Sequence, residues 1–184
     1  MRRLPDLITS LRLIAAPFLV WLIAAGRFRA ALLLIVVAGA TDWLDGFAAR
    51  RLQVSGRFGT VLDPLADKVL LVTVFLALAV TRLIPLWLVC LAIGRDLTIV
   101  CGALLLRVFR GRQKFSPSLL GKISTFFQIV LVLLVLAAAA FPYQLVRWLE
   151  LTAIVSSAFF TGLSGIDYVH RGIQMAHEPR APRV

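Results

Sequence analysis

Four aspartates stand within twenty-six residues of one another in a chain that is otherwise mostly apolar. They are Asp42, Asp45, Asp63 and Asp67, and only five other acidic residues occur among the 184. Carboxylate oxygens without a nearby Cys or His favour hard ions such as Mg²⁺, Mn²⁺ or Ca²⁺. Two such ions held by carboxylates can clamp a pyrophosphate and stabilise in-line attack at phosphorus. The cluster therefore predicts metal-assisted chemistry at a phosphate.

The spacing of these aspartates predicts two helices that face each other. Asp42 and Asp45 are three residues apart, and Asp63 and Asp67 are four apart, so each pair lies on one face of a helix. The segment between the pairs contains glycines and predicts a short turn. Two antiparallel helices joined in this way bring four carboxylates together at the membrane boundary.

Small residues and an arginine accompany the first pair. Gly46 and Ala49 leave the helix surface open for a ligand, and Arg50 has the geometry to bind a phosphate in bidentate fashion. The alternative is that the aspartates are solvated helix ends paired with Arg50 or Arg57. Four carboxylates on converging faces repel one another strongly, which favours a metal site. The sequence has no G-x-x-x-x-G-K-[ST] loop, so nothing in it supports ATP binding.

The composition is that of a membrane protein. The chain is 60% hydrophobic with a mean hydropathy of +0.93, which exceeds the apolar share of a soluble domain. Apolar runs near 20 residues are typical of transmembrane helices. We therefore predict an all-α, polytopic membrane protein, a bundle of six transmembrane helices over residues 8–26, 30–50, 62–81, 84–107, 118–140 and 145–170.

Six spans with short loops leave no room for a second domain. We expect residues 1–184 to form one membrane domain, with a basic disordered tail over about 173–184. The first apolar run follows Arg2 and Arg3, as in a signal peptide, but Arg12 interrupts it. We interpret it as a retained first helix.

Basic residues are distributed unevenly about the predicted spans. The net charge is +11, and fifteen of the twenty Lys and Arg lie on the side that carries both termini. The positive-inside rule places that side, with the aspartates, in the cytoplasm. A basic rim suits anionic lipid head groups. The charges fringe membrane spans and form no separate basic domain, so we expect no nucleic-acid partner.

Eight residues of the aspartate segment form a long pattern, D-x2-D-G-x2-A-R-x8-G-x3-D-x3-D. This pattern resembles the signature of the CDP-alcohol phosphotransferases, and the six-span layout is similar to that family as well. The eight positions are Asp42, Asp45, Gly46, Ala49, Arg50, Gly59, Asp63 and Asp67.

The resemblance implies a phosphatidyl transfer in phospholipid biosynthesis. A CDP-linked alcohol, often CDP-diacylglycerol, would bind at the motif, and an acceptor hydroxyl would attack the phosphorus next to the lipid and release CMP. Two divalent ions, Mg²⁺ or Mn²⁺, would be needed. The resemblance also implies a homodimer in a membrane, which we expect to be the bacterial inner membrane.

Site roles follow from the resemblance, position by position. Asp42, Asp45, Asp63 and Asp67 would ligate the metals, and Asp67 would act as general base on the acceptor hydroxyl. The CDP moiety would contact a second group, which comprises Asp42, Gly46, Ala49, Arg50 and Gly59.

Flanking segments resemble the branch that makes phosphatidylglycerophosphate and cardiolipin. "LPDLITSLRLIAAP" and "LLGKISTFFQ" resemble phosphatidylglycerophosphate synthases and the related cardiolipin synthases, whereas "GRD" at 94–96 departs from the glycerophosphate enzymes and is more similar to CMP-forming cardiolipin synthases. The resemblance implies glycerol-3-phosphate as the first choice of acceptor and phosphatidylglycerol as the alternative.

Two basic residues are candidates for the acceptor phosphate. Arg95 stands beside Asp96 inside a predicted span, and it either binds this phosphate or stabilises packing through an ion pair. Lys122 stands at the beginning of the fifth predicted span, where it either binds phosphate or belongs to the ordinary positive-inside charge beside that span.

Two other classes of protein remain as alternatives. Intramembrane carboxylates also occur in divalent-cation transporters, but here no acidic path continues to the other membrane face. A non-catalytic membrane scaffold would not require the complete eight-residue motif.

Overall fold

A computed structural model describes the backbone of residues 16–52, 59–110 and 118–177. It describes the side chains of these residues except those of 42–52, 59–67, 106–110 and 176–177.

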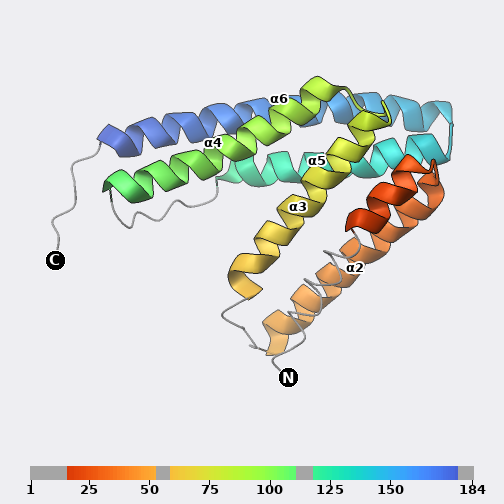
Figure 1. The fold of residues 1–184 in the computed structure, drawn as a ribbon, viewed down its shortest axis with the longest axis horizontal. Coiled ribbons are helices and arrows are strands. Elements are labelled where there is room, and N and C mark those ends of the chain that lie inside the picture. Colours follow the sequence, from red (N-terminus) through yellow and green to blue (C-terminus); the bar gives the residue numbers. More distant parts are fainter. Residues whose placement is uncertain (1–15, 53–58, 111–117, 178–184) are drawn as a thin grey trace. The chain divides into compact units, whose positions relative to one another are not determined.

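Helices make up the described part of the chain (Figure 1). Residues 16–24 are helical. Five further helices follow, and no strand occurs in the three described ranges. The all-α prediction is confirmed. The five helices are α2 (Phe28–Leu52), α3 (Gly59–Val80), α4 (Leu86–Arg110), α5 (Leu119–Ala140) and α6 (Gln144–His177).

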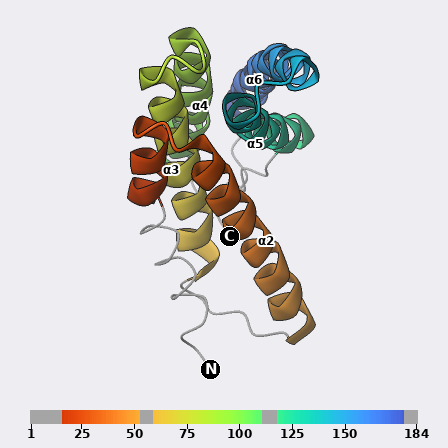
Figure 2. The same ribbon diagram turned by 90° about the vertical axis from the view of Figure 1, so that its right-hand side faces the viewer.

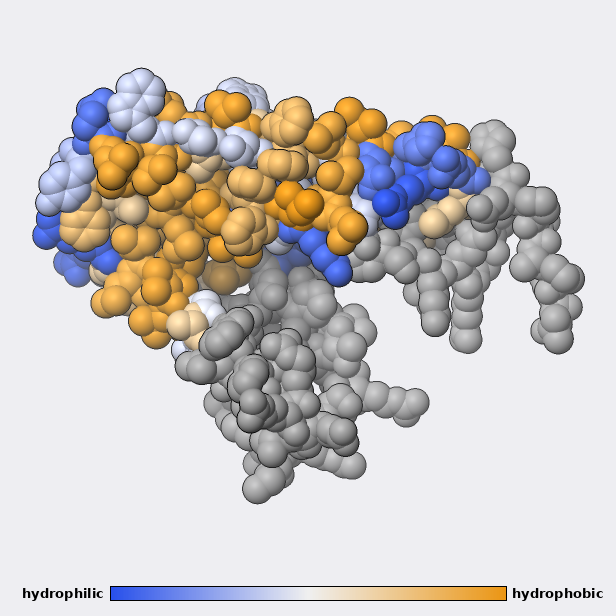
Figure 3. Space-filling view, turned by 180° about the vertical axis from the view of Figure 1, so that it is seen from behind, coloured by the Kyte–Doolittle hydropathy of each residue, from blue (hydrophilic) through white to orange (hydrophobic). Residues whose placement is uncertain are grey.

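Three of these helices are long and apolar enough to cross a membrane: Leu86–Leu105, Leu119–Ala140 and Gln144–Met175. Among the side chains that were described, shorter apolar stretches occupy Phe28–Thr41 and Lys68–Val80. The last three predicted spans are therefore confirmed, and the full count of six stays a prediction. Apolar side chains cover most of the coloured surface in Figure 3, as expected for a surface that meets lipid.

The last helix is longer than its predicted span. It continues to His177, whereas the apolar run predicted an end at residue 170 and a tail from about 173. The first proline after Pro142 is Pro179, and a proline disfavours helical backbone at the residue before it. The helix thus continues to within two residues of that proline, beyond residue 170, where the predicted apolar run ended.

Two helix ends share one capping geometry. After residues 16–24, Gly26 has φ 69°, and the Arg27 N–H bonds to the Leu22 carbonyl at 2.9 Å. After α3, Arg82 has φ 59°, and the Leu83 N–H bonds to the Leu78 carbonyl at 2.9 Å. Both ends are Schellman motifs, in which one residue adopts the left-handed backbone conformation. Glycine adopts this conformation more readily than arginine does.

The helices fall into two compact units, residues 1–85 with 132–150, and residues 86–131 with 151–184. We call them unit 1 and unit 2. Whether the chain forms one domain stays a prediction.

Unit 1 contains residues 16–24, α2, α3 and the turn between α5 and α6. Leu19, Ile23 and Leu78 are among its fully buried side chains. The Arg29 guanidinium donates to the Ala140 carbonyl at 3.3 Å, and it lies 5.2 Å from the ring of Phe141. This contact attaches the start of α2 to the α5–α6 turn.

Unit 2 contains α4, the first half of α5 and most of α6. Phe127 and Phe160 stack with ring centroids 4.5 Å apart. Beside them, Thr161 of α6 bonds to Ser124 at 3.1 Å and to Gln128 at 3.3 Å. Small residues and interhelical hydrogen bonds of this kind hold helices together in membranes.

Candidate active site

The first half of the aspartate motif lies on α2. This helix continues without interruption from Phe28 to Leu52, so Asp42, Asp45 and Ala49 lie on one of its faces. The shared face was predicted from spacing alone, and the helical backbone confirms it.

The second half of the motif lies at the start of α3. Gly59 is the first residue of the helix, and Asp63 and Asp67 follow one turn apart on the same face. Both motif helices belong to unit 1. The end of α2 and the beginning of α3 lie at the same end of this unit in both views (Figures 1 and 2).

The side chains of the four aspartates lie outside the described ones. The distances between their carboxylates and the metal site therefore stay predictions, as does the contact of Gly46, Ala49 and Arg50 with CDP. Among the side chains that the structure describes, no three His, Cys, Asp or Glu residues gather in one place. The donor set of the motif consists of carboxylates, which fits hard divalent ions.

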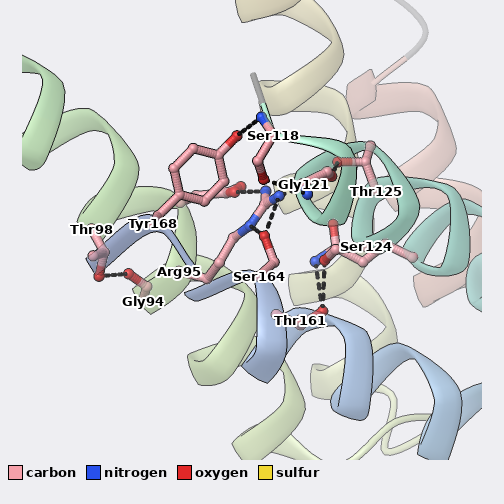
Figure 4. A network of polar contacts seen from close by, with 12 residues as sticks. Gly94, Arg95, Thr98, Ser118, Gly121, Ser124, Thr125, Thr161, Ser164 and Tyr168 are labelled. Atoms are coloured by element: carbon pink, nitrogen blue, oxygen red, sulfur yellow. Dashed lines mark hydrogen bonds and ion pairs between the residues drawn. The ribbon is translucent and has the colours of Figure 1, made fainter. Parts of the chain in front are cut away.

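Arg95 is the charged residue that unit 2 buries most completely among those described, with 6% of its surface exposed. Its Nε donates to Ser164 Oγ at 3.1 Å, and its Nη2 donates to the same oxygen at 3.0 Å and to the Gly121 carbonyl at 2.9 Å. Its Nη1 lies 2.7 Å from Asp96 Oδ1. The guanidinium thus links α4 to both α5 and α6, and Figure 4 shows it pointing toward Gly121 and Ser164.

The contacts of Arg95 bear on its predicted role. A guanidinium has five N–H donors, and four donor contacts are directed at Asp96, Gly121 and Ser164. The ion-pair interpretation of Arg95 and Asp96 is confirmed. Binding of an acceptor phosphate by Arg95 is not tested by these contacts.

Gly121 is the point at which this network meets α5. A Cβ placed on Gly121 would lie 2.6 Å from the Tyr168 hydroxyl and 3.1 Å from Arg95 Nη2. The same hydroxyl accepts the backbone N–H of Ser118 at 3.0 Å, and Ser118 Oγ caps α5 by accepting the Gly121 N–H at 3.0 Å. Only a residue without a side chain allows this close approach.

Lys122 follows Gly121 and is exposed in the first turn of α5. Arg95 bonds to the carbonyl of the preceding residue, so the network in unit 2 fixes the backbone beside Lys122. Two further residues of the "LLGKISTFFQ" pattern have hydrogen bonds within the chain. Thr125 donates to the Gly121 carbonyl of its own helix at 3.1 Å, and the buried Gln128 bonds to Thr161 of α6.

The sequence did not indicate that Gly121, Ser164 and Tyr168 contact Arg95, or that Ser118 supports this network through Tyr168 and Gly121. Their one local signal was a buried charge that needed compensation, and this signal does not say where the partners lie. A second ion pair joins residues at i, i+4 on α6, a spacing that places two side chains next to each other on a helix. The Arg171 Nε lies 2.9 Å from Asp167 Oδ1.

Comparisons with known proteins point in one direction. A family model described as CDP-alcohol phosphatidyltransferase matches residues 2–160. A CDP-diacylglycerol–glycerol-3-phosphate 3-phosphatidyltransferase of Aquifex aeolicus is 34% identical, over 93% of this chain and 96% of that protein. The enzyme of the same name from Bacillus subtilis is 36% identical, over 74% and 69%.

A relative with another name is similar to nearly the same degree. A CMP-forming cardiolipin synthase of Rattus norvegicus is 32% identical, over 92% of this chain and 61% of that protein. These likenesses agree with the motif on α2 and α3 and with the apolar helices. The chain therefore belongs to the CDP-alcohol phosphatidyltransferase family.

Proposed function

We propose that this protein transfers a phosphatidyl group from CDP-diacylglycerol to an alcohol, most simply to glycerol-3-phosphate, with release of CMP. The proposal is carried by the complete eight-residue motif on two consecutive helices of one unit. Family membership supports it, and so do the names of relatives at 34% and 36% identity.

In this proposal the carboxylates of α2 and α3 organise the reaction. Asp42, Asp45 and Asp63 hold two divalent ions, Mg²⁺ or Mn²⁺, together with Asp67. When bound, such ions neutralise the charge of the pyrophosphate and of the leaving CMP. Gly46 and Ala49 let the nucleotide approach the helix backbone.

Asp67 has a second role in the proposal, as general base. It accepts the proton of the acceptor hydroxyl while the oxygen attacks the phosphorus that carries diacylglycerol. The bond from this phosphorus to the CMP oxygen breaks, and CMP leaves. Asp42 and Arg50 orient the CDP moiety, and Gly59 allows α3 to begin close to the bound nucleotide.

A phosphate of the acceptor would be bound by basic residues of unit 2. Lys122 is suited to this because it is exposed and its backbone is fixed by Arg95. Arg95 is the second candidate, because one of the two N–H donors on its Nη1 is not directed at Asp96. Both glycerol-3-phosphate and phosphatidylglycerol carry a phosphate, so phosphate binding by these residues does not distinguish between the two acceptors.

Cardiolipin formation from phosphatidylglycerol is the second candidate function. The residues "GRD" at 94–96 favour it, together with the 32% identity to the rat cardiolipin synthase.

The charge distribution supports a cytoplasmic active site with both termini on the same side, in a bacterial inner membrane. We also propose a homodimer, by analogy with the family. Membership of an enzyme family argues against a divalent-cation transporter or an inactive scaffold, and a metal-flux assay in proteoliposomes would show transport directly.

The test of the function is CMP release by the purified protein in mixed micelles of CDP-diacylglycerol and detergent. Parallel reactions contain glycerol-3-phosphate or phosphatidylglycerol, each with Mg²⁺, with Mn²⁺ or with a chelator. We expect metal-dependent release with glycerol-3-phosphate. Release with phosphatidylglycerol alone would establish the second candidate, and silence of an intact protein with both acceptors would overturn the proposal.

The role of Asp67 needs its own variant. Asp67→Asn should lower kcat by about 10²–10⁴-fold, the usual contribution of a general base, while CDP-diacylglycerol still binds. If binding is lost as completely as in Asp42→Asn, Asp67 is chiefly a metal ligand.

A further inference from the structure

A cavity of about 690 Å³ opens along α4 and α6 within unit 2. Residues from both helices line it, among them Cys90, Gly94 and Thr98 of α4 and Gly162, Gly165 and His170 of α6. We call it the α4–α6 groove. Both helices are candidate membrane spans, so the groove lies on a part of the chain that is surrounded by lipid.

Three glycines keep the groove open. A Cβ placed on Gly94 or Gly162 meets no atom within 4 Å, and at Gly165 the nearest atom is Arg95 Cγ at 3.9 Å. Glycine is unfavourable inside a helix, and none of these three has a positive φ that would require it. Close packing against another described helix does not explain Gly94 and Gly162, since a Cβ at either position meets no described atom within 4 Å. They preserve a space that another molecule can fill.

The polar residues of the lining direct most of their hydrogen-bonding groups at partners within the chain. Arg95 contributes its methylene stem, while its guanidinium points the other way, toward Gly121 (Figure 4). The others are bonded within the chain: Thr98 to the Gly94 carbonyl at 2.8 Å, Thr161 to Ser124 at 3.1 Å, and His170 to Gln174 at 2.8 Å. The groove therefore suits an apolar occupant.

The length of the groove fits one leaflet of a membrane. At the rise of an α-helix, Cys90 and Thr98 are about 12 Å apart along α4, and Thr161 and Ile173 are about 18 Å apart along α6. Half the hydrocarbon core of a bilayer is about 15 Å. A single acyl chain lying along the helices would span the groove from end to end.

Basic residues follow the groove lining in the sequence of α4. Past Thr98, the last α4 residue of the lining, this helix carries Arg107 and Arg110. On α6, Arg171 stands within the lined stretch, next to His170, and pairs with Asp167. The excess of basic residues suits an anionic head group at the cytoplasmic surface.

We propose that the α4–α6 groove binds one acyl chain of an anionic glycerophospholipid from the cytoplasmic leaflet. This site uses neither the aspartates of α2 and α3 nor the acceptor residue Lys122. It is a lipid site in addition to the catalytic one, and it does not depend on the proposed function.

Two cysteines of the same helix provide the test. Cys90 lines the groove and Cys101 does not, and both are exposed free thiols. Cys101→Ser leaves Cys90 as the reporter, and Cys90→Ser leaves Cys101 as the control. The rate of modification by N-ethylmaleimide is measured in detergent, with and without dioleoyl phosphatidic acid, an anionic lipid that is neither donor nor acceptor in the proposed reaction.

We expect the lipid to slow modification of Cys90 about tenfold at about ten times Kd, since only about one groove in eleven is then empty. Cys101 should react at an unchanged rate. Dioleoyl phosphatidylcholine should protect Cys90 only at higher concentration, because its head group carries no net charge.

Gly162→Leu fills the groove, and Gly102→Leu is the matched control. Gly102 lies on α4 outside the lining, and a Cβ placed on it likewise meets no atom within 4 Å. We expect Cys90 in the Gly162→Leu protein to react slowly and without response to lipid, whereas Gly102→Leu should behave as the parent. Protection should persist in an Asp63→Asn protein, which separates this site from catalysis.

Three results would overturn the proposal. Equal slowing of both cysteines would mean that lipid coats α4 without preference. Protection of Cys90 that rises with protein concentration in the absence of lipid would mean that a second copy of the chain fills the groove. Unchanged protection in a folded Gly162→Leu protein would place the lipid elsewhere.

Discussion

The two units of this protein carry charged groups of opposite sign, a buried arginine in unit 2 and an acidic sequence motif in unit 1. In unit 2, the Arg95 guanidinium is compensated from within the chain, by Asp96, Gly121 and Ser164. In unit 1, α2 and α3 bring acidic residues into a motif that holds one arginine among four aspartates. Removing one partner of a buried ion pair leaves the other charge unpaired and destabilises the fold, whereas a set of carboxylates favours hard divalent cations as partners. We therefore propose that the Arg95 cluster is structural and that the acidic motif is catalytic.

We expect the largest effect on activity from a substitution in the acidic motif of α2 and α3. Asp42→Asn should lower kcat/KM about 10²–10³-fold or more, the loss expected when a charge that stabilises a transition state is removed. The thermal unfolding of the apoprotein should be little changed. Steady-state kinetics and unfolding of the same preparation check this, and strong destabilisation with normal turnover would reverse the roles of the two regions.

Breaking the compensated charge should affect the fold instead. Arg95→Met removes the ion pair with Asp96 and should lower the free energy of unfolding by about 3–5 kcal/mol. Replacing both residues, as Arg95→Met with Asp96→Leu, should recover most of that loss.

The double variant also decides whether Arg95 binds the acceptor. A stable double variant with an ordinary acceptor KM would assign Arg95 to packing alone. A raised KM with unchanged stability would add the phosphate role. Thermal unfolding in detergent and the acceptor dependence of CMP release measure the two quantities.

Gly121→Ala should have a smaller effect. The added methyl group would lie 2.6 Å from the Tyr168 hydroxyl, and such overpacking costs about 1–3 kcal/mol. Combining it with Tyr168→Phe should recover part of the lost free energy of unfolding, because the hydroxyl is removed. A double-mutant cycle measures the coupling between the two residues.

Gly102→Ala is the matched control. Its Cβ meets nothing within 4 Å, so this substitution should stabilise α4 by up to about 1 kcal/mol. Equal effects of both alanines would contradict the close approach.

The smallest expected effect is at Lys122. Lys122→Gln should raise the acceptor KM about tenfold, which corresponds to loss of one charged hydrogen bond of about 1.5 kcal/mol. The kcat at saturating acceptor and the unfolding temperature should stay constant, because the side chain is exposed. Lys122→Arg should retain much of the affinity. A fall in kcat with unchanged KM would place Lys122 outside the acceptor site.

The features that could be predicted from the sequence are local in the chain. The aspartate pattern spans twenty-six residues, and helical periodicity converts it into two faces. Hydropathy located α4, α5 and α6, since twenty apolar residues need no tertiary information to indicate a span.

The rest depends on contacts between distant residues. Arg95 and Ser164 are 69 positions apart, and no spacing rule predicts that they meet. In the sequence, Gly121 resembles any other helical glycine, and only the structure shows that Tyr168 lies against it. The end of α6 was missed because Arg171 and Gln174 lower the hydropathy without interrupting the helix. These features could be found only from the three-dimensional arrangement.

The central claim is that the carboxylates of α2 and α3 meet to hold two divalent ions. Electron paramagnetic resonance of Mn²⁺ bound to the purified protein tests it most directly. We expect two ions per chain, coupled to one another as in a site with a separation of about 3.5–4 Å, and loss of the coupled signal in both Asp42→Asn and Asp63→Asn. A protein that is active in CMP release but binds a single uncoupled ion, or keeps the coupled pair in both variants, would contradict the claim.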